Sequence, residues 1–417
     1  MSVSDLSSGA DLEQLYRDLH ASPELSLQEH RTATLAADQL AKADFEVITN
    51  IGGTGVVGVM ANGPGPTALV RADMDALPVQ EQTGLLYASQ CRATDRDGHE
   101  VPVMHACGHD MHVTCLIGAA RDLAATRDSW SGRLLVVFQP AEELGTGAQA
   151  MIDDGLFDRA GRPDVVLGQH VAPFPAGFVG VRPGPAFAAA DGLRVTLYGR
   201  GAHGSRPEAG IDPVVMAAAT VMRLQGVVSR EVAGDDTAVV TVGAVRAGTK
   251  ENIIPDDAEL LLSVRSVDPA VRARILEAIA RIVRAEAAAS AATREPDIVT
   301  LFSFPAVVND PQGAARISAA FARRFGADRV VDPGAVTGSE DVGLFAVAAS
   351  APCVYWLLGG ADPACFADAT TEADIAAAAR GLPSNHSPLY APVPQPTLAT
   401  GIAALTTAVR TWLPPIA

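Results

Sequence analysis

Cysteine and aromatic residues are both scarce in this sequence. Its 417 residues include only five cysteines, and aromatic residues make up 5% of the chain. Because the cysteine count is odd and the positions are widely scattered, no disulfide framework is expected, and a reducing compartment is favoured. The opening stretch MSVSDLSSGADLEQL has neither a basic start nor an apolar segment, so nothing in it predicts export. We therefore expect a cytoplasmic protein.

Positive charge and long apolar runs are also in short supply. Lysine and arginine total 31 against 48 aspartates and glutamates, which gives a formal net charge of -17. This excess of acid repels phosphate backbones, so nucleic acid is not expected as a partner. The longest apolar stretch, residues 344–358, is interrupted by Ser350 and Pro352. It is shorter than the roughly 20 residues that cross a bilayer, so no membrane association is expected.

Hydrophobic residues, by contrast, are plentiful. They make up 48% of the chain, which is enough for one large core or two of ordinary size. Segments rich in valine and leucine alternate with long alanine-rich helical stretches. This order predicts an α/β domain with a mostly parallel central sheet and helices on both faces. Near-continuous apolar segments predict strands buried on both faces at residues 55–60, 67–72, 133–138 and 164–168.

Capping residues predict where several helices begin. Ser26 and Glu29 have the spacing of a capping box, which would open a helix that runs through Ala43. A further helix is expected over residues 109–125, between two of the buried strands, and a closing one over residues 395–413.

A change of composition near residue 185 predicts a domain boundary. Residues 181–192, VRPGPAFAAADG, supply prolines, glycines and small residues before a new strand. The following strands and helices have the order of a compact two-layer α+β domain, and the α/β pattern returns after about residue 304. The sequence therefore predicts a larger domain of residues 1–188 and 305–417, interrupted by a smaller domain of residues 189–304.

Polar residues follow three of the buried strands closely. Asp73 and Asp75 come after the second strand, Glu142 and Glu143 after the third, and His170 after the fourth. In open α/β sheets ligands bind at the carboxyl ends of the strands. We therefore expect these side chains to converge at one edge of the sheet.

The densest chemical signal is a cysteine and a histidine separated by one glycine. Four of the nine histidines lie within residues 99–112, and Cys107 and His109 are in the middle of that window. Gly108 lets the backbone turn tightly, so a thiolate and an imidazole can point at one ion. The alternative is a buried cysteine beside surface histidines, and two ligands alone do not make a metal site.

Further ligands are available elsewhere in the chain. Glu142 and Glu143 follow a buried strand and a rigid Pro140, so one carboxylate can bind metal while its neighbour faces substrate. The alternative for such a pair is a solvated loop. His170 follows another strand, and His386 lies in a loop near the C-terminus. Either histidine alone would more often be structural.

Taken together, these residues predict a two-metal hydrolase. The mixed ligand set is too large for one tetrahedral ion and suits two divalent ions, with zinc, manganese, cobalt and nickel as the candidates. It consists of Cys107, His109, Glu143, His170 and His386. Ions in such a site acidify water so that hydroxide is available near neutral pH. Glu142 would then be the general base that carries the proton to the leaving nitrogen.

Five segments, in order along essentially the whole chain, resemble the successive motifs of a known enzyme family. They are RADMDALP at 71–78, MHACGHD at 104–110, QPAEE at 139–143, GRGAHGSRP at 199–207 and GSED at 338–341. The resemblance is to the M20 metallopeptidases, and most of all to their subfamily D of amidohydrolases. That branch contains hippurate hydrolases, bacterial N-acyl-amino-acid amidohydrolases and plant hydrolases of indole-acetyl amino acids.

The resemblance implies the same metal ligands, the same general base and a role for the smaller domain. It implies a catalytic domain interrupted by a lid through which family members commonly form homodimers. His203 would donate to the developing oxyanion, often across subunits, although a plain turn residue is the alternative. Asn252 matches a second lid motif and would help to hold substrate, unless it is an ordinary turn asparagine.

One further candidate comes from charge alone. Arg265 lies at the end of a predicted lid strand, where its guanidinium can clamp a substrate carboxylate. A surface ion pair is the alternative for this side chain.

The sequence thus predicts a metal-dependent amidohydrolase that splits an N-acyl or aryl-acyl amino acid into a carboxylic acid and a free amino acid. Two enzymatic alternatives use the same hydroxide, namely a dipeptidase and an aromatic-amine aminohydrolase. The alternative outside enzymes is a catalytically silent metal-binding scaffold, against which the presence of Glu142 beside the ligands argues.

Overall fold

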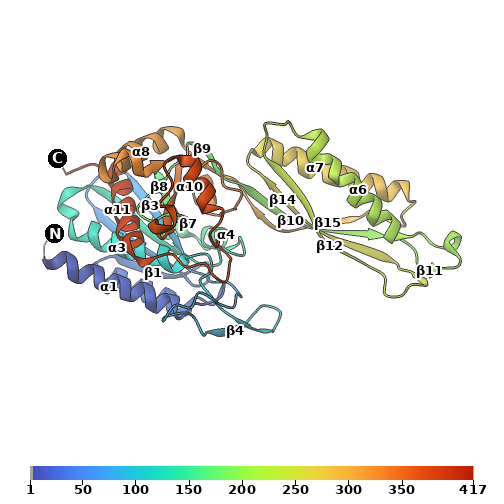
Figure 1. The fold of residues 1–417 in the computed structure, drawn as a ribbon, viewed down its shortest axis with the longest axis horizontal. Coiled ribbons are helices and arrows are strands. Elements are labelled where there is room, and N and C mark those ends of the chain that lie inside the picture. The colour runs from blue at the N-terminus through green and yellow to red at the C-terminus, as the bar shows by residue number, and fades with distance from the viewer. Residues whose placement is uncertain (1–2, 417) are drawn as a thin grey trace. The chain divides into compact units, whose positions relative to one another are not determined.

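The computed structural model describes residues 3–416, which form two compact units (Figure 1). The first unit extends through Gly184 and resumes at Val308–Gly334 and again at Asp341. The second unit comprises Pro185–Val307 and the short segment Ala335–Glu340. The second unit thus contains the whole of residues 189–304, together with a separate piece of chain that the composition of the sequence did not mark.

The first unit is built on an eight-stranded sheet in the order β1-β2-β6-β3-β7-β18-β8-β17. Strands β6, β3, β7 and β18 run parallel to one another, whereas β1, β2 and β8 add antiparallel pairings. The strands are β1 (Glu46–Ile51), β2 (Gly55–Asn62), β3 (Thr67–Asp73), β6 (Gly132–Gln139), β7 (Val165–Pro175), β8 (Val179–Gly180), β17 (Val330–Val331) and β18 (Cys353–Ala361). Most side chains of the central strands are buried, as their apolar sequences predicted.

Helices cover this sheet and complete its core. Helix α3 is buried over most of its length, and it packs against α1, α11 and β3. Helices α4 and α9 pack against each other and against β6 and β7 respectively. The helices of this unit are α1 (Val3–His20), α2 (His30–Lys42), α3 (His109–Ala125), α4 (Gly147–Asp153), α5 (Leu156–Ala160), α8 (Pro311–Phe325), α9 (Gly343–Ala349), α10 (Glu372–Ala379) and α11 (Pro394–Trp412).

The predicted capping box at the start of α2 is wrong. The helix begins at His30, with Glu29 as its N-cap, and no side chain caps it. The Ser26 hydroxyl instead donates to Asp75 Oδ2 at 2.6 Å. The Glu29 carboxylate is fully buried and accepts bonds from the Ala141 N–H at 2.9 Å and the Thr54 hydroxyl at 2.6 Å. Contacts with distant segments therefore use the side chains that would otherwise have capped the helix.

The second unit has one antiparallel sheet in the order β12-β14-β10-β15. Helices α6 (Pro213–Glu231) and α7 (Pro269–Ala289) pack on it and against each other (Figure 1). Each helix is capped by an aspartate that precedes a proline, which is a strong start signal. The strands are β10 (Ala189–Tyr198), β12 (Ala238–Ala247), β14 (Asp257–Ser266) and β15 (Asp297–Phe304), with a small ladder of β11 (Ala202–His203) and β13 (Ile253–Ile254). This is the two-layer α+β architecture that the sequence predicted.

Four short strands complete the fold. They are β4 (Arg92–Thr94), β5 (Glu100–Pro102), β9 (Gly184–Phe187) and β16 (Val307–Asn309). Within residues 3–416, no helix combines the length and the apolar character needed to cross a membrane.

Candidate metal centre

The candidate site lies where β3 and β6 end beside the longer strand β7. Pairing between β3 and β7 stops at Arg71 and Gly168, but β7 continues to Pro175 along β18. The sequence predicted that His170 follows a strand, but the structure places it within β7. Since β3 no longer covers this edge, the N–H of Val171 bonds to a side chain, that of His112.

A glycine shapes the loop that carries Cys107 and His109. His109 is the first residue of α3, and Gly108 before it has a φ of 82°. Left-handed backbone of this kind favours glycine. A Cβ at this position would also lie 2.5 Å from Cγ1 of Val171. The close approach of the loop to β7 thus requires glycine.

A carboxylate holds the turn that carries the two glutamates. The Asp75 oxygens accept bonds from the N–H groups of Glu142 at 3.1 Å and Glu143 at 3.0 Å. Ala141 before them has a φ of 48°, and its N–H is bonded to Glu29. The backbone direction after β6 is consequently set by two buried acids, and both glutamate side chains lie in the site.

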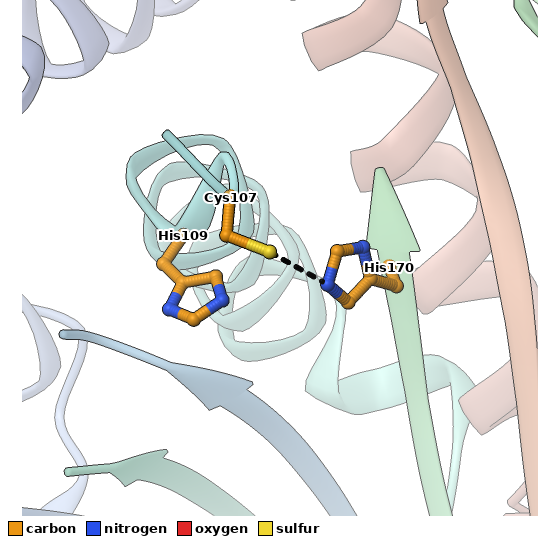
Figure 2. Close-up of side chains that lie close together, drawn as sticks. All are labelled: Cys107, His109 and His170. Atoms are coloured by element: carbon orange, nitrogen blue, oxygen red, sulfur yellow. Dashed lines mark hydrogen bonds between the residues drawn. The ribbon is translucent and has the colours of Figure 1, made fainter. Parts of the chain in front are cut away.

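The structure brings all the predicted ligands together. Cys107, His109 and His170 form one group whose donor atoms lie within 4.8 Å of one another (Figure 2). A second such group contains Cys107, Glu143 and His386, and a third contains His109, Glu142 and Glu143. The Cys107 Sγ lies 3.5 Å from Nε2 of His170, and Oε1 of Glu143 lies 3.2 Å from Nε2 of His386.

Buried polar atoms without hydrogen bonds test whether a cation fits here. Among the described residues, Nε2 of His109 and Oε1 of Glu143 are buried and form no well-oriented hydrogen bond, although Oε1 lies 3.2 Å from Nε2 of His386. Such atoms are rare in folded proteins, because losing water without gaining a partner is costly. A cation bound among a thiolate, imidazoles and carboxylates supplies the missing partner. The donor set present therefore fits divalent metal ions.

His105 is also buried with both ring nitrogens unbonded, but its surroundings differ. Burial lowers the pKa of His105 to about 4, so this ring is neutral at ordinary pH. For His109, burial also lowers the pKa, but the charges of Asp73, Asp75 and Glu143 outweigh that effect and raise it to about 10. Nδ1 of His109 lies 3.3 Å from Oδ1 of Asp75, and its Nε2 lies 3.9 Å from Oε1 of Glu143. His109 is thus in a strongly anionic environment, which is where a cation binds.

Hydrogen bonds distinguish His112 from the predicted ligands. The Val171 N–H donates to Nε2 of His112 at 2.8 Å, so the ring proton must be on Nδ1, which faces Asp73 Oδ1 at 2.5 Å. Both nitrogens of this ring are therefore engaged by the protein, although Asp73, His109 and His112 also form a compact group. His112 is not among the ligands predicted from the sequence, and these contacts leave its ring no nitrogen for a metal ion.

A buried network of charged side chains adjoins the site through Asp73. The Arg71 guanidinium, fully buried, donates to Asp73 Oδ2 at 2.6 Å, Gln139 Oε1 at 2.8 Å and Asp341 Oδ1 at 3.0 Å. Burial raises the pKa of Asp73, but His109, His112 and Arg71 outweigh it and hold that pKa well below its usual range. Asp73 is therefore ionised, and its Oδ2 lies 3.7 Å from Nε2 of the predicted ligand His109.

The partnership of Arg71 and Asp341 was missed at the level of sequence. Arg71 belongs to the segment RADMDALP and Asp341 to the segment GSED, both of which resemble family motifs. The two residues are 270 positions apart in the chain. The position of both residues in such segments was the one feature of the sequence that could have marked them as important. Only the folded chain shows that they bond to each other.

The remaining predicted residues lie in the second unit. His203, in β11, is exposed, and its Nδ1 lies 2.7 Å from the Ser205 hydroxyl. The Gly204 N–H donates to the carbonyl of Asn252 at 2.8 Å, so the His203 and Asn252 segments are neighbours within this unit.

Arg265 is in β14 and bonds to neutral groups. Its Nη1 donates to the Ser339 hydroxyl at 2.6 Å and to the Thr337 carbonyl at 3.3 Å. These contacts differ from the surface ion pair considered as its alternative role, and they tie part of the GSED segment to the second unit's sheet.

Known proteins resemble this chain over most of its length. The peptidase family M20/M25/M40 matches residues 69–382. A thermostable carboxypeptidase 2 from Saccharolobus solfataricus is 36% identical over 351 residues, which is 83% of this chain and 85% of the relative. A hippurate hydrolase from Campylobacter jejuni is 42% identical over 283 residues, which is 67% of this chain and 70% of the relative.

A solved structure has the same fold. It is a dinuclear metal-binding peptidase of the M20 family from Bacillus subtilis, with a TM-score of 0.75 and 29% sequence identity. The match covers 97% of this chain and 98% of the other, so both units are included.

Proposed function

The chain belongs to peptidase family M20/M25/M40, and from this premise we propose that it hydrolyses the amide bond of N-acyl or aryl-acyl amino acids. It is a metal-dependent hydrolase. The observation that carries the proposal is the convergence of the ligand groups beside His109, whose buried Nε2 has no hydrogen bond. The products would be a carboxylic acid and a free amino acid.

Five residues would hold two divalent ions, and Glu142 would act beside them. The proposed ligands are Cys107, His109, Glu143, His170 and His386. When bound, the ions supply Lewis acidity and make water a nucleophile near neutral pH. Zinc suits the thiolate and the imidazoles, while manganese, cobalt and nickel also suit mixed carboxylate and imidazole sets.

Glu142 is placed for proton transfer. Its side chain is grouped with His109 and Glu143, and its main chain is fixed by the bond to Asp75. The carboxylate would take a proton from the attacking water and return it to the leaving nitrogen. A group that must do both needs a fixed position next to the reacting atoms, which the Asp75 contact supports.

The second unit would complete the site as a lid. We propose that His203 donates to the oxyanion of the tetrahedral intermediate, while Asn252 and Arg265 help to hold the substrate. We also propose that the protein is a homodimer through this unit. Exposed apolar side chains support this proposal, because Val239 and Val245 lie on the edge strand β12.

The relatives support N-acyl amino acids as the proposed substrate class, with peptides as the main alternative. Hippurate is an N-acyl amino acid, and the hippurate hydrolase has the higher identity of the two relatives, at 42%. The carboxypeptidase relative favours peptides as the second candidate. Deamination of aromatic amines is a third candidate activity, and a catalytically silent metal-binding scaffold is the candidate outside enzymes.

A cytoplasmic location is also proposed. It is supported by the state of the cysteines, all five of which are free.

A product screen tests the function directly. The metal-reconstituted protein would be incubated with N-acyl amino acids, dipeptides and aromatic amines, and the products identified by mass spectrometry. We expect free amino acid and carboxylic acid from the acyl conjugates, and none after chelation. Dipeptide cleavage or ammonia release alone would favour the competing enzymes, and no turnover with metal bound would favour the scaffold.

A further inference from the structure

One peptide group links several of the proposed ligands. The Val171 carbonyl accepts a bond from Nδ1 of His170 at 2.8 Å, because a carbonyl can only accept. The His170 proton is therefore on Nδ1, and Nε2 is the nitrogen that faces Cys107. The same carbonyl also accepts from the Tyr390 hydroxyl at 3.3 Å and from Nδ2 of Asn385 at 3.2 Å.

Asn385 joins this peptide group to the cysteine loop. Its Nδ2 donates to the Cys107 carbonyl at 3.1 Å as well as to the Val171 carbonyl, and it lies 3.8 Å from the Cys107 Sγ. Both oxygen partners are acceptors only, so the amide nitrogen must face them. An amide nitrogen has two hydrogens, which matches the two carbonyls.

The next residue, His386, has an unusual backbone. Its φ is 72°, which side-chain-bearing residues rarely adopt outside turns and functional sites. Its N–H donates to the Ala106 carbonyl at 2.8 Å. The loop is therefore fastened to the cysteine loop at two consecutive residues, 385 and 386, and this holds the His386 ring beside Glu143.

We propose that Asn385 is a positioning residue that fixes three ligands, Cys107, His170 and His386, relative to one another. It acts through the two main-chain carbonyls and through its own place beside His386 in the chain. This inference rests on the proposed function for the identity of the ligands. Groups that orient metal ligands typically change metal affinity when they are removed, by about 10–100-fold.

Two substitutions remove this link in different ways. Asn385→Asp keeps the shape but places carboxylate oxygens against two carbonyl oxygens, so repulsion replaces attraction. Asn385→Ser is shorter and loses the paired donors without adding charge. We expect zinc affinity to fall by about 10–100-fold in Asn385→Ser and by more in Asn385→Asp.

Asn309 offers a matched control. It is fully buried, and its Nδ2 donates to two main-chain carbonyls, those of Arg182 and Tyr355, both at 2.8 Å. Asn309→Ser therefore removes the same kind of link from the same unit, but away from the ligand loops. It is expected to lower the melting temperature while leaving zinc affinity unchanged.

The experiment combines zinc affinity with a spectroscopic readout. Affinity would be measured by chelator competition on the full chain. The cobalt-substituted protein would be examined for the thiolate-to-cobalt charge-transfer band, which reports coordination by Cys107. We expect Asn385→Ser to weaken zinc binding and to shift or reduce the band, with native circular dichroism, whereas Asn309→Ser keeps both signals.

The outcomes distinguish a failure of this inference from a failure of the proposed function on which it rests. If wild type binds two ions and shows the band, but Asn385→Ser and Asn385→Asp behave like wild type, Asn385 has no positioning role. If Asn309→Ser weakens zinc binding as much as Asn385→Ser does, the effect is general destabilisation and the inference is wrong. A wild-type protein that takes up no metal would overturn the proposed function and the inference with it.

Discussion

At the scale of single residues, three neighbouring histidines differ in what their ring nitrogens contact. The rings of His109, His112 and His170 pack with centroids no more than 6.0 Å apart. His112 has both nitrogens engaged by Asp73 and Val171, whereas Nε2 of His109 makes no hydrogen bond. The partners of His112 therefore leave it no nitrogen for a metal ion, whereas Nε2 of His109 faces Glu143 and Nε2 of His170 faces Cys107.

Metal content should distinguish His109 from His112. We expect His109→Ala to lose bound metal, because a ligand is removed, and His112→Ala to retain two ions per chain with lower affinity. Elemental analysis of the purified, metal-reconstituted variants measures this. If His112→Ala instead lost one full equivalent of metal, His112 would itself be a ligand and its assignment as a supporting residue would be wrong.

Glu142 provides a test of chemistry apart from binding. We expect Glu142→Gln to bind metal normally but to lose about 10²–10⁴-fold in kcat, which is the usual contribution of a general acid or base. Steady-state kinetics on the best acyl amino acid, alongside metal analysis, would check this. Retention of kcat within a few-fold would show that the proton is carried by another group.

At the scale of secondary-structure elements, a buried histidine connects the first and third helices. His20, the last residue of α1, donates from Nδ1 to Asp110 Oδ2 of α3 at 2.7 Å and from Nε2 to Glu81 Oε1 at 3.1 Å. Burial lowers the pKa of His20, but the bonds to Asp110 and Glu81 outweigh it and raise the pKa to about 10. The charged ring therefore holds α1 against the start of α3.

This contact predicts loss of stability in alkali. Because the folded-state pKa of His20 lies above its ordinary value of 6.5, its contribution is complete below about pH 6.5 and is lost as the pH rises toward 10. We expect His20→Gln to be less stable than wild type at pH 6, with the difference shrinking toward pH 10. Urea unfolding at a series of pH values, with metal content held equal, would measure it.

An exposed histidine serves as the control for this pH series. His30 lies on the surface at the start of α2, so His30→Gln shows what replacing a surface histidine does in the same assay. A constant difference between His20→Gln and wild type across the whole pH range would mean that His20 stabilises the helix contact through packing and not through charge.

At the scale of the whole molecule, the edge strand β12 is the place to test assembly. Val239 and Val245 on this strand are 45% and 55% exposed. An edge strand with exposed apolar residues is a natural site for pairing between chains. We expect the double substitution Val239→Lys with Val245→Lys to convert a dimer into a monomer by sedimentation velocity, because lysines on an edge oppose pairing.

Activity of the same variant bears on His203. If His203 acts across subunits, the monomer should also lose kcat, and if it acts within one chain, activity should persist. Val347→Lys, which alters an exposed apolar residue of α9 in the other unit, is the matched control and should change neither property. A wild-type protein that sediments as a monomer would contradict the homodimer.

Local pattern explains why much of the fold was predictable. The buried strands at 55–60, 67–72 and 133–138 lie within β2, β3 and β6, because a near-continuous apolar segment is best buried in the middle of a sheet that is covered on both faces. The capping box at Ser26 and Glu29 failed for the opposite reason. Those side chains bond to Asp75, Thr54 and Ala141, and no local pattern reveals such partners.

The sequence by itself therefore predicted most of the elements and brought forward the candidate ligands, because helical and strand periodicity and ligand types are properties of short segments. Only the tertiary structure decided how those residues are supported. Asn385 and Cys107 are 278 residues apart in the chain, a separation that no short motif spans. Which nitrogen of His112 carries its proton also depends on distant contacts, with Asp73 and Val171, because hydrogen bonds form between groups that are close in space and not only in sequence.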